Sequence, residues 1–373
     1  MPFAQLSTVR HRVQLGSPLP FHVRDVNRQL LLARGQIVAS QAQLEALCER
    51  GAVIDLADLQ SARDEIMKAP REQLPRLWSG CIQQVSRTLR HACGAGFRQA
   101  LTEATEPVQT LVERDPDLAI FQVLCQGHNE DAAYGAQRSM QTAIAAMLVA
   151  QRLGWEASQC ERLFKVALTM NLSMLELQGQ LARQRTAPTE QQRRDLQSHP
   201  ERSVLILEQA GIVDGDWLQA VLRHHEQEDG SGYPAGCTDV GELAALARRV
   251  DVYTAKLSAR STRDALAADV AGRQMFMQDP GHPMTAALVK EFGIFPPGCY
   301  VRLASGELAI VVQRGPTITT PMVARLTNER GMPLPTPERM QTTDRAHAVE
   351  AVVGERSLNV RLPPDRLAAL MTA

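Results

Sequence analysis

Three histidines and one carboxylate are the residues of this sequence best suited to chemistry. His224 and His225 are adjacent and are followed by Glu226, while His199 and Asp251 lie before and after this pair. Imidazole and carboxylate groups on separate helices of one bundle suit zinc, iron or manganese. The pattern predicts a metal site of His199, His224 and His225, with Asp251 as a fourth ligand or as support for the others. The alternative is a set of polar core residues hydrogen-bonded to backbone or to Asp251.

Helical spacing around the histidine pair indicates that it faces an interior. Leu218, Val221 and Leu222 form an apolar stripe that His225 extends. His224 lies about 100° around the same helix. Both imidazoles can therefore point into the protein.

Two further helices are expected to carry the remaining candidates. His199 is predicted at the start of one of them. The other contains Asp251 and is predicted to continue through Arg260 and Arg263, two to three turns beyond it. Two arginines on one helix face suit a phosphate. A solvated face with an i, i+4 pair between Arg260 and Asp264 is the alternative.

A Gly-Ser-Gly-Tyr-Pro run at residues 230–234 ends the helical pattern after the histidine pair. Glycine permits positive φ and lets the backbone approach a ligand closely. Gly232, Tyr233 and Pro234 are therefore candidate ligand contacts. A loop with a rigid turn and no ligand is the alternative.

A helical bundle is the element that must position these side chains. Residues 119–295 show helical periodicity almost throughout. From residue 296 to 373 the pattern changes to period two around Ser305 and Gly306, which predicts a β-hairpin, and a short helix is expected from Pro364 to Met371. The hairpin and this helix form a C-terminal extension.

The N-terminal part of the chain is expected to be organised separately. Residues 1–60 are predicted to form a small mixed α/β unit, with a hairpin and a helix that Ser40 caps. Residues 61–118 are interpreted as a helical connector. The predicted fold class is therefore mainly α.

Composition excludes several classes of protein. The chain has 373 residues, 44% of them hydrophobic, and its 40 Lys and Arg against 41 Asp and Glu give a net charge of -1. No global basic field favours nucleic acid or an anionic membrane as partner. No apolar run approaches the roughly 18 residues of a membrane span, so a cytoplasmic location is expected. Seven scattered cysteines without a CxxC pair fit a reducing compartment and exclude a zinc ribbon.

The series of motifs resembles the HD-GYP family of the HD superfamily, whose members hydrolyse or sense cyclic di-GMP. Residues 224–234 match its HHE…DGSGYP signature, His199 and Pro200 match its HP element, and Asp251 matches its late metal-binding Asp. The resemblance covers roughly residues 119–315 and implies an HD-type helical bundle.

The resemblance also implies ligands for the arginines and the loop. Arg260 and Arg263 fall where family members place basic residues that contact the phosphates of cyclic di-GMP. The Gly-Tyr-Pro loop lies beside the pocket in the family and contributes to interactions with partner proteins. The implied partners are therefore cyclic di-GMP or a related nucleotide, and a signalling protein at this loop.

The chain departs from the family at the HD pair itself. Met170, Asn171 and Met174 stand where the family has His, Asp and a following Lys. Tyr134 and Arg138 stand where some members have Glu and His ligands for an additional metal. The losses fall on one half of the expected site.

These replacements argue against hydrolysis. In a two-metal hydrolase the ions lie about 3.5–4 Å apart and share bridging ligands. A neutral Asn171 cannot readily bridge two cations, and the thioether of Met170 is a poor ligand for hard or borderline ions. The i, i+4 spacing of Met170 and Met174 favours core filling over soft-metal ligation. We expect at most one divalent ion (Fe, Mn or Zn), or none, and phosphodiesterase activity that is absent or very low.

Three functions are compatible with these features. The favoured one is a non-catalytic cyclic di-GMP sensor or protein-interaction adaptor with a degenerate HD-GYP domain. The second is a metal-dependent cyclic di-GMP phosphodiesterase with a reduced metal site. The third is a helical scaffold without ligand.

Overall fold

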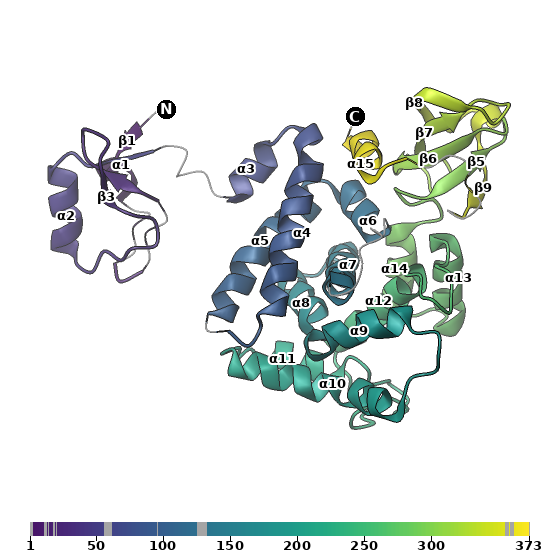
Figure 1. Cartoon of the computed structure of the whole chain (residues 1–373), viewed down its shortest axis with the longest axis horizontal. Coiled ribbons are helices and arrows are strands. Elements are labelled where there is room, and N and C mark those ends of the chain that lie inside the picture. The colour runs from purple at the N-terminus through teal and green to yellow at the C-terminus, as the bar shows by residue number, and fades with distance from the viewer. Residues whose placement is uncertain are drawn as a thin grey trace. The chain divides into compact units, whose positions relative to one another are not determined.

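The computed structural model describes residues 3–10, 13, 15–17, 19, 21–55, 62–94, 96–124, 133–354, 358 and 362–372. Cys125 and the expected boundary at residues 60 and 61 lie outside these ranges. The chain forms two compact units, Met1–Ala69 and Pro70–Ala373 (Figure 1). Within the described ranges, no helix has both the length and the apolar character needed to cross a bilayer.

The first unit is a small antiparallel sheet with helices. The predicted hairpin is present, because Val23 pairs with Leu32 across a turn that begins at Asp25. Ser40 caps the following helix as predicted, accepting a hydrogen bond from the Gln43 N–H. The strand order is β1-β4-β2-β3. The elements of this unit are β1 (Phe3–Gln5), α1 (Leu6–Val9), β2 (Val23–Arg24), β3 (Leu30–Leu32), α2 (Gln41–Glu49), β4 (Val53–Asp55) and α3 (Ala62–Lys68).

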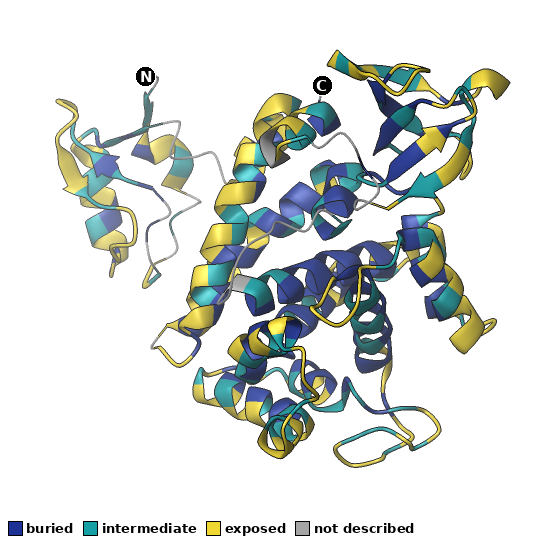
Figure 2. Ribbon diagram, turned by 45° about the vertical axis from the view of Figure 1, so that its right-hand side comes forward, coloured by how far each residue is buried: buried dark blue, intermediate teal, exposed yellow. Residues whose placement is uncertain are grey.

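The second unit is a helical bundle built around helix α7 (Ala133–Arg152). Every residue from 138 to 150 is buried, and Figure 2 shows buried residues concentrated along the middle of the bundle. Helix α7 packs against α4, α6, α8, α9, α12 and α14. The helices around it are α4 (Leu74–Arg90), α5 (Phe97–Arg114), α6 (Pro116–Leu124), α8 (Ala157–Thr169), α9 (Leu175–Arg183), α10 (Glu190–Gln209), α11 (Gly215–Arg223), α12 (Glu242–Leu257), α13 (Ala268–Gln278) and α14 (Pro283–Phe292), with the 3-10 turns η3 (Arg71–Gln73) and η4 (Leu172–Met174).

A five-stranded antiparallel sheet follows the bundle. The predicted hairpin around Ser305 and Gly306 is present, with Val301 opposite Ala309. It is part of a larger sheet of order β8-β7-β6-β5-β9, whose three further strands were not predicted from the sequence. The remaining elements are β5 (Tyr300–Leu303), β6 (Leu308–Gln313), β7 (Met322–Thr327), β8 (Pro333–Gln341), η5 (Arg345–His347), β9 (Val349–Val353) and α15 (Pro364–Thr372), the last being the expected C-terminal helix.

Ion pairs join this sheet to the bundle. Arg314, which follows β6, donates to Asp117 of α6 at 2.5 Å and to Glu291 of α14 at 2.8 Å. The Glu291 and Asp117 side chains are mostly shielded from solvent. One arginine therefore ties the end of a central strand to two helices of the bundle.

Candidate metal centre

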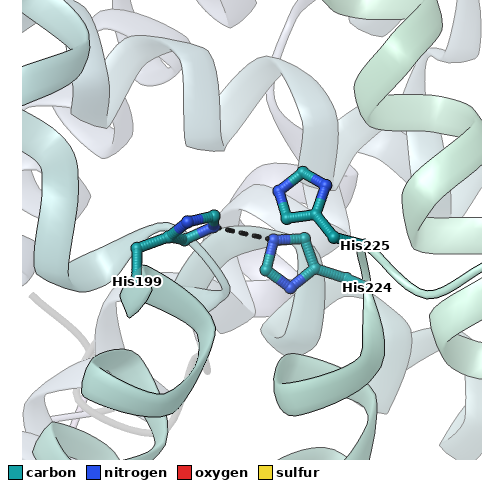
Figure 3. Close-up of side chains that lie close together, drawn as sticks. All are labelled: His199, His224 and His225. Atoms are coloured by element: carbon teal, nitrogen blue, oxygen red, sulfur yellow. Dashed lines mark hydrogen bonds between the residues drawn. The ribbon is translucent and has the colours of Figure 1, made fainter. Parts of the chain in front are cut away.

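His199, His224 and His225 form one cluster in the second unit (Figure 3). One ring nitrogen of each lies within 4.8 Å of the corresponding nitrogens of the other two. His199 and His224 are fully buried and His225 is partly buried. The structure therefore brings together three of the four residues that the sequence selected as metal ligands.

His199 lies inside α10, and the prediction that it begins a helix is wrong. The helix starts at Glu190, where Thr189 and Gln192 form a capping box. Pro200 lies in the helix interior, where its missing N–H leaves the Leu196 carbonyl without an i+4 donor. Nδ1 of His199 lies 2.6 Å from this carbonyl oxygen and occupies the vacant place.

His224 is the C-cap of α11, which ends at Arg223. A helix end leaves its last carbonyl groups without intrahelical donors. Nδ1 of His224 lies 2.6 Å from the carbonyl oxygen of Val221 in this last turn. The same local device thus holds two imidazoles on two different helices.

These contacts determine where the imidazole protons are. A carbonyl oxygen only accepts, so Nδ1 carries the proton in both His199 and His224. A neutral imidazole has a single N–H, which leaves a lone pair on each Nε2. The two Nε2 atoms face each other at 3.1 Å, as the dashed line in Figure 3 shows. A proton or a metal ion between the two Nε2 atoms would remove the electrostatic repulsion between their lone pairs.

Electrostatics opposes the proton. Burial, followed by the proximity of His224, lowers the pKa of His199 to about 3. Burial, followed by His199, lowers the pKa of His225 to about 3, and burial holds the pKa of His224 well below its usual value. All three rings are neutral near pH 7, which is the state in which imidazole binds metals. The His199 and His224 Nε2 atoms, 3.1 Å apart, fit one divalent ion, because ligand nitrogens about 2.0–2.1 Å from a tetrahedral zinc lie roughly 3.3 Å apart. His225 is within reach as a third donor.

The Gly-Tyr-Pro loop closes over this cluster. The Tyr233 ring stacks on His225, with centroids 4.5 Å apart and 16° between the planes. A Cβ on Gly232 would lie 2.4 Å from Cα of Glu226, so only glycine allows this approach. Glu226 is buried and accepts hydrogen bonds from the backbone N–H groups of residues 235, 236 and 237. The sequence marked Tyr233 as a ligand contact but gave no signal for its stacking.

Asp251 is not part of the histidine group. Its Oδ1 lies 3.4 Å from Nη2 of Arg138, whose Nη1 donates to Ser258 Oγ at 3.0 Å. Arg138 is buried on α7. Burial raises the pKa of the Asp251 carboxyl, and the nearby Arg138 opposes that rise. Arg138 pairs with this carboxylate, and the more distant Arg260 also acts to lower its pKa. The role of Asp251 as a metal ligand stays a prediction.

Arg260 and Arg263 do not lie on the helix of Asp251, so the prediction that this helix continues through them is wrong. Helix α12 ends at Leu257, and the two arginines pair through backbone N–H and carbonyl groups in an exposed turn. Nη2 of Arg263 donates to the carbonyl of Ala255 at 2.5 Å. The helical i, i+4 geometry assumed for a pair of Arg260 with Asp264 is absent, because both residues lie beyond the end of α12. Phosphate binding by the two arginines stays a prediction.

The degenerate positions lie in the interior. Met170 is fully buried, and Asn171 and Met174 are nearly so. Gly135 of α7 lies against Leu175 just beyond them, since a Cβ there would be 2.2 Å from the Leu175 carbonyl oxygen. Within the described residues, Oδ1 of Asn171 is buried without a hydrogen-bond partner.

A cavity of about 180 Å³ opens beside the cluster. His224, His225 and Tyr233 line one part of it, and Asp251 lines another. Gln227 and Arg248 also line it, and neither was selected from the sequence. The remaining lining residues are Ser231, Gly232 and Val252.

Residues 124–274 match the family described as HD domain. The protein named Cyclic di-GMP phosphodiesterase PA4108 of Pseudomonas aeruginosa is 33% identical over 162 residues, which are 42% of this chain and 39% of that protein. The protein named Cyclic di-GMP phosphodiesterase response regulator RpfG of Xanthomonas campestris pv. campestris is 31% identical over 139 residues, 36% of each protein. The matched segments thus span well under half the length of these relatives.

A solved structure supports the fold. The protein described as Bd1817, a HDG"Y"P protein from Bdellovibrio bacteriovorus, superimposes with a TM-score of 0.50 at 12% sequence identity. The match covers 78% of this chain and 98% of that one. The predicted fold class, a mainly helical HD-type bundle with a C-terminal β extension, is confirmed.

Proposed function

We propose that this chain, whose residues 124–274 form a domain of the HD family, is a cyclic di-GMP signalling protein that binds the nucleotide without hydrolysing it at a useful rate. Two relatives that carry the phosphodiesterase name support the choice of nucleotide. The absence of hydrolysis is proposed from the residues of the site.

The observation that carries the proposal is the contrast between the two halves of the site. On one side, neutral His199 and His224 direct lone pairs toward each other at 3.1 Å. On the other side, the HD positions hold Met170 and Asn171, which are buried and carry no charge. The first half suits one cation, and the second half lacks the carboxylate that would bridge a second one.

The histidines would hold one divalent ion, which would supply positive charge to the phosphate oxygens of a bound nucleotide. The chain's own residues would do the rest. Val221 and Leu196 fix the proton positions of two imidazoles through their carbonyl groups. Tyr233 stacks on His225 and so covers one face of its ring. The result is a pocket that can bind the nucleotide but lacks the second metal ion needed to generate and position a hydroxide nucleophile.

The exposed part of the Gly-Tyr-Pro loop is the proposed contact for a signalling partner. Asp229, Ser231 and Pro234 are exposed, while Glu226 anchors the loop from inside. A partner could therefore contact the outer side of the loop without entering the cavity.

A phosphodiesterase with a reduced metal site is the second candidate. It is favoured by Oδ1 of Asn171, a buried acceptor that is without a hydrogen bond among the described residues. A single amide oxygen could still serve as one ligand of a metal ion. It cannot neutralise charge as a bridging carboxylate does.

Metal content and turnover separate these functions. We expect the purified chain to hold about one divalent ion, to bind cyclic di-GMP and to release no linear dinucleotide or GMP. His224→Ala should lose the ion, whereas His91→Ala should keep it, because His91 is exposed on the end of α4. Steady turnover with two ions would establish the phosphodiesterase instead. If the purified chain binds neither a metal ion nor cyclic di-GMP, the remaining function is a helical scaffold without ligand.

A further inference from the structure

Arg248 is a cation at the cavity that neither the sequence motifs nor the histidine cluster accounts for. It lies on α12 one turn before Asp251 and lines the same cavity as His225 and Tyr233. Its side chain is close enough to His225 to contribute to the low pKa of that imidazole. Arg248 is therefore next to the proposed ion site rather than on the outer surface of the bundle.

The pairing of Arg248 differs from that of its neighbours. Arg249 makes ion pairs with Glu228 at 3.2 Å and Asp279 at 2.9 Å, and Arg138 pairs with Asp251. Arg248 donates from Nη2 to the neutral amide oxygen of Gln227 at 2.6 Å. Across the described part of the chain it makes no ion pair. The carboxylates of Glu228, Asp229 and Asp279 act on its charge without an ion pair to its guanidinium, so the guanidinium itself stays open to a ligand.

The other donors of Arg248 are also available. Nε and Nη1 make no hydrogen bond to any described residue, and neither is enclosed by protein. Gln227 is itself held by Ser231, with its Nε2 2.8 Å from the Ser231 hydroxyl. The amide therefore fixes one side of the guanidinium and leaves the other side free. A planar guanidinium in this state can bind two oxygens of one phosphate.

The charge of the cavity favours an anion. The Asp251 carboxylate is paired with Arg138 and also lies close enough to Arg260 to feel its charge. Arg248 is left as the unbalanced charge among the lining residues of the cavity. The volume of about 180 Å³ is below the roughly 300–1,000 Å³ of pockets that enclose a whole ligand. It suits one phosphodiester group, with the rest of the nucleotide outside.

We infer that Arg248 binds the phosphodiester group of the nucleotide and is the main protein cation in its recognition. This inference rests on the proposed function. It assigns the phosphate to a half-buried residue of α12, whereas Arg260 and Arg263 lie on the exposed turn beyond that helix.

Equilibrium binding of labelled cyclic di-GMP to the full chain tests this role. Arg248→Gln should weaken binding about tenfold or more, the usual effect of losing a charged hydrogen-bond partner. The affinity of Arg248→Lys should fall between those of the wild type and Arg248→Gln, because lysine keeps the positive charge but lacks the planar pair of N–H donors of a guanidinium. Lys256→Gln is the matched control, since Lys256 lies on the same helix and also donates to an amide oxygen, that of Gln274. It should bind within about twofold of the wild type.

Two further measurements make the result decisive. Metal content and the melting temperature of each variant report whether the site is folded, and if Arg248→Gln is unfolded the Arg248→Lys result decides. Inorganic phosphate and guanosine are the second set of probes. Phosphate should compete for the site in an Arg248-dependent manner, and guanosine should not.

The outcomes distinguish the inference from the proposed function. Nucleotide binding by the wild type that is unchanged in Arg248→Gln would overturn the inference and leave the proposed function standing. Arg248-dependent binding of phosphate without any binding of the nucleotide would keep the anion site and overturn the nucleotide assignment. If the wild type binds neither, both are wrong.

Discussion

Trp217 donates its indole N–H to Oγ1 of Thr169 at 2.9 Å, and both residues are buried. Thr169 is the last residue of α8, directly before Met170, and Trp217 belongs to α11, whose C-cap is His224. One buried hydrogen bond therefore joins the helix that precedes the degenerate positions to the helix that carries the histidine pair. The protein itself therefore links the two halves of the site.

Met170 should behave as a core residue. Met170→Ala should lower the free energy of unfolding by about 2–5 kcal/mol, because truncating a fully buried side chain leaves a cavity. Met170→Leu should cost less than about 1.5 kcal/mol, since it nearly conserves the volume. Urea unfolding measures both changes. Loss of the bound ion in Met170→Leu, with stability unchanged, would instead identify Met170 as a ligand.

The metal-free protein should lose stability in mild acid. Burial lowers the pKa of His199 and His225 to about 3, whereas an unfolded histidine titrates near about 6.5. Between these values the unfolded chain binds protons that the folded chain does not. This contribution to stability is complete above about pH 6.5 and falls toward pH 3, by up to about 1.4 kcal/mol per pH unit for each histidine.

Urea unfolding with a chelator, from neutral pH down into mild acid, measures this slope. His224→Gln should reduce it, because the pKa of His224 is also held low by burial. His91→Gln should leave it unchanged. Equal slopes in all three proteins would show that the buried imidazoles do not cause the acid sensitivity.

Gly232→Ala should displace the Gly-Tyr-Pro loop. The added Cβ would lie 2.4 Å from Cα of Glu226, which the backbone cannot accommodate without moving. Tyr233 should then leave His225, with faster proteolysis of the loop and an ion affinity reduced about 10–100-fold. Gly215→Ala is the control, because nothing lies within 4 Å of the place that its Cβ would occupy. Unchanged proteolysis and affinity in Gly232→Ala would contradict the role assigned to this contact.

Arg138 and Asp251 should be energetically coupled. Arg138→Met leaves a largely buried carboxylate without its ion-pair partner and should cost about 3–5 kcal/mol. Adding Asp251→Asn should recover much of this loss, which a double-mutant cycle measures. Asp251→Asn alone should keep the bound ion. If it loses the ion as His224→Ala does, Asp251 is a direct ligand and the pairing with Arg138 is secondary.

The histidine cluster could be predicted from the sequence because its residues belong to local patterns. His225 follows an apolar stripe of α11, and the adjacent His224 cannot lie far from it. The start of α10 could not be predicted in this way, because proline usually marks the first turn of a helix. Pro200 is tolerated inside α10, where the His199 ring occupies the carbonyl that the missing N–H leaves free.

Local sequence patterns could not predict which side chains and strands pair over long distances in the sequence. Arg138 and Asp251 lie on α7 and α12, and nothing local to either residue indicates the other. Arg248 and Arg249 are adjacent and of the same type, yet one lines the cavity while the other is tied to Glu228 and Asp279. Strand β8 was missed because its prolines are typical of loops.

The Arg138–Asp251 pair makes the charge at one wall of the cavity independent of metal supply. A chelator can remove an ion from three histidines, but it cannot remove a guanidinium that is part of the chain. When metal is scarce, the histidine cluster would therefore lose its ion, whereas the charges of Arg138 and Asp251 would stay unchanged. If the chain is the receptor proposed above, this wall of the cavity would persist under conditions that would disable a two-metal enzyme.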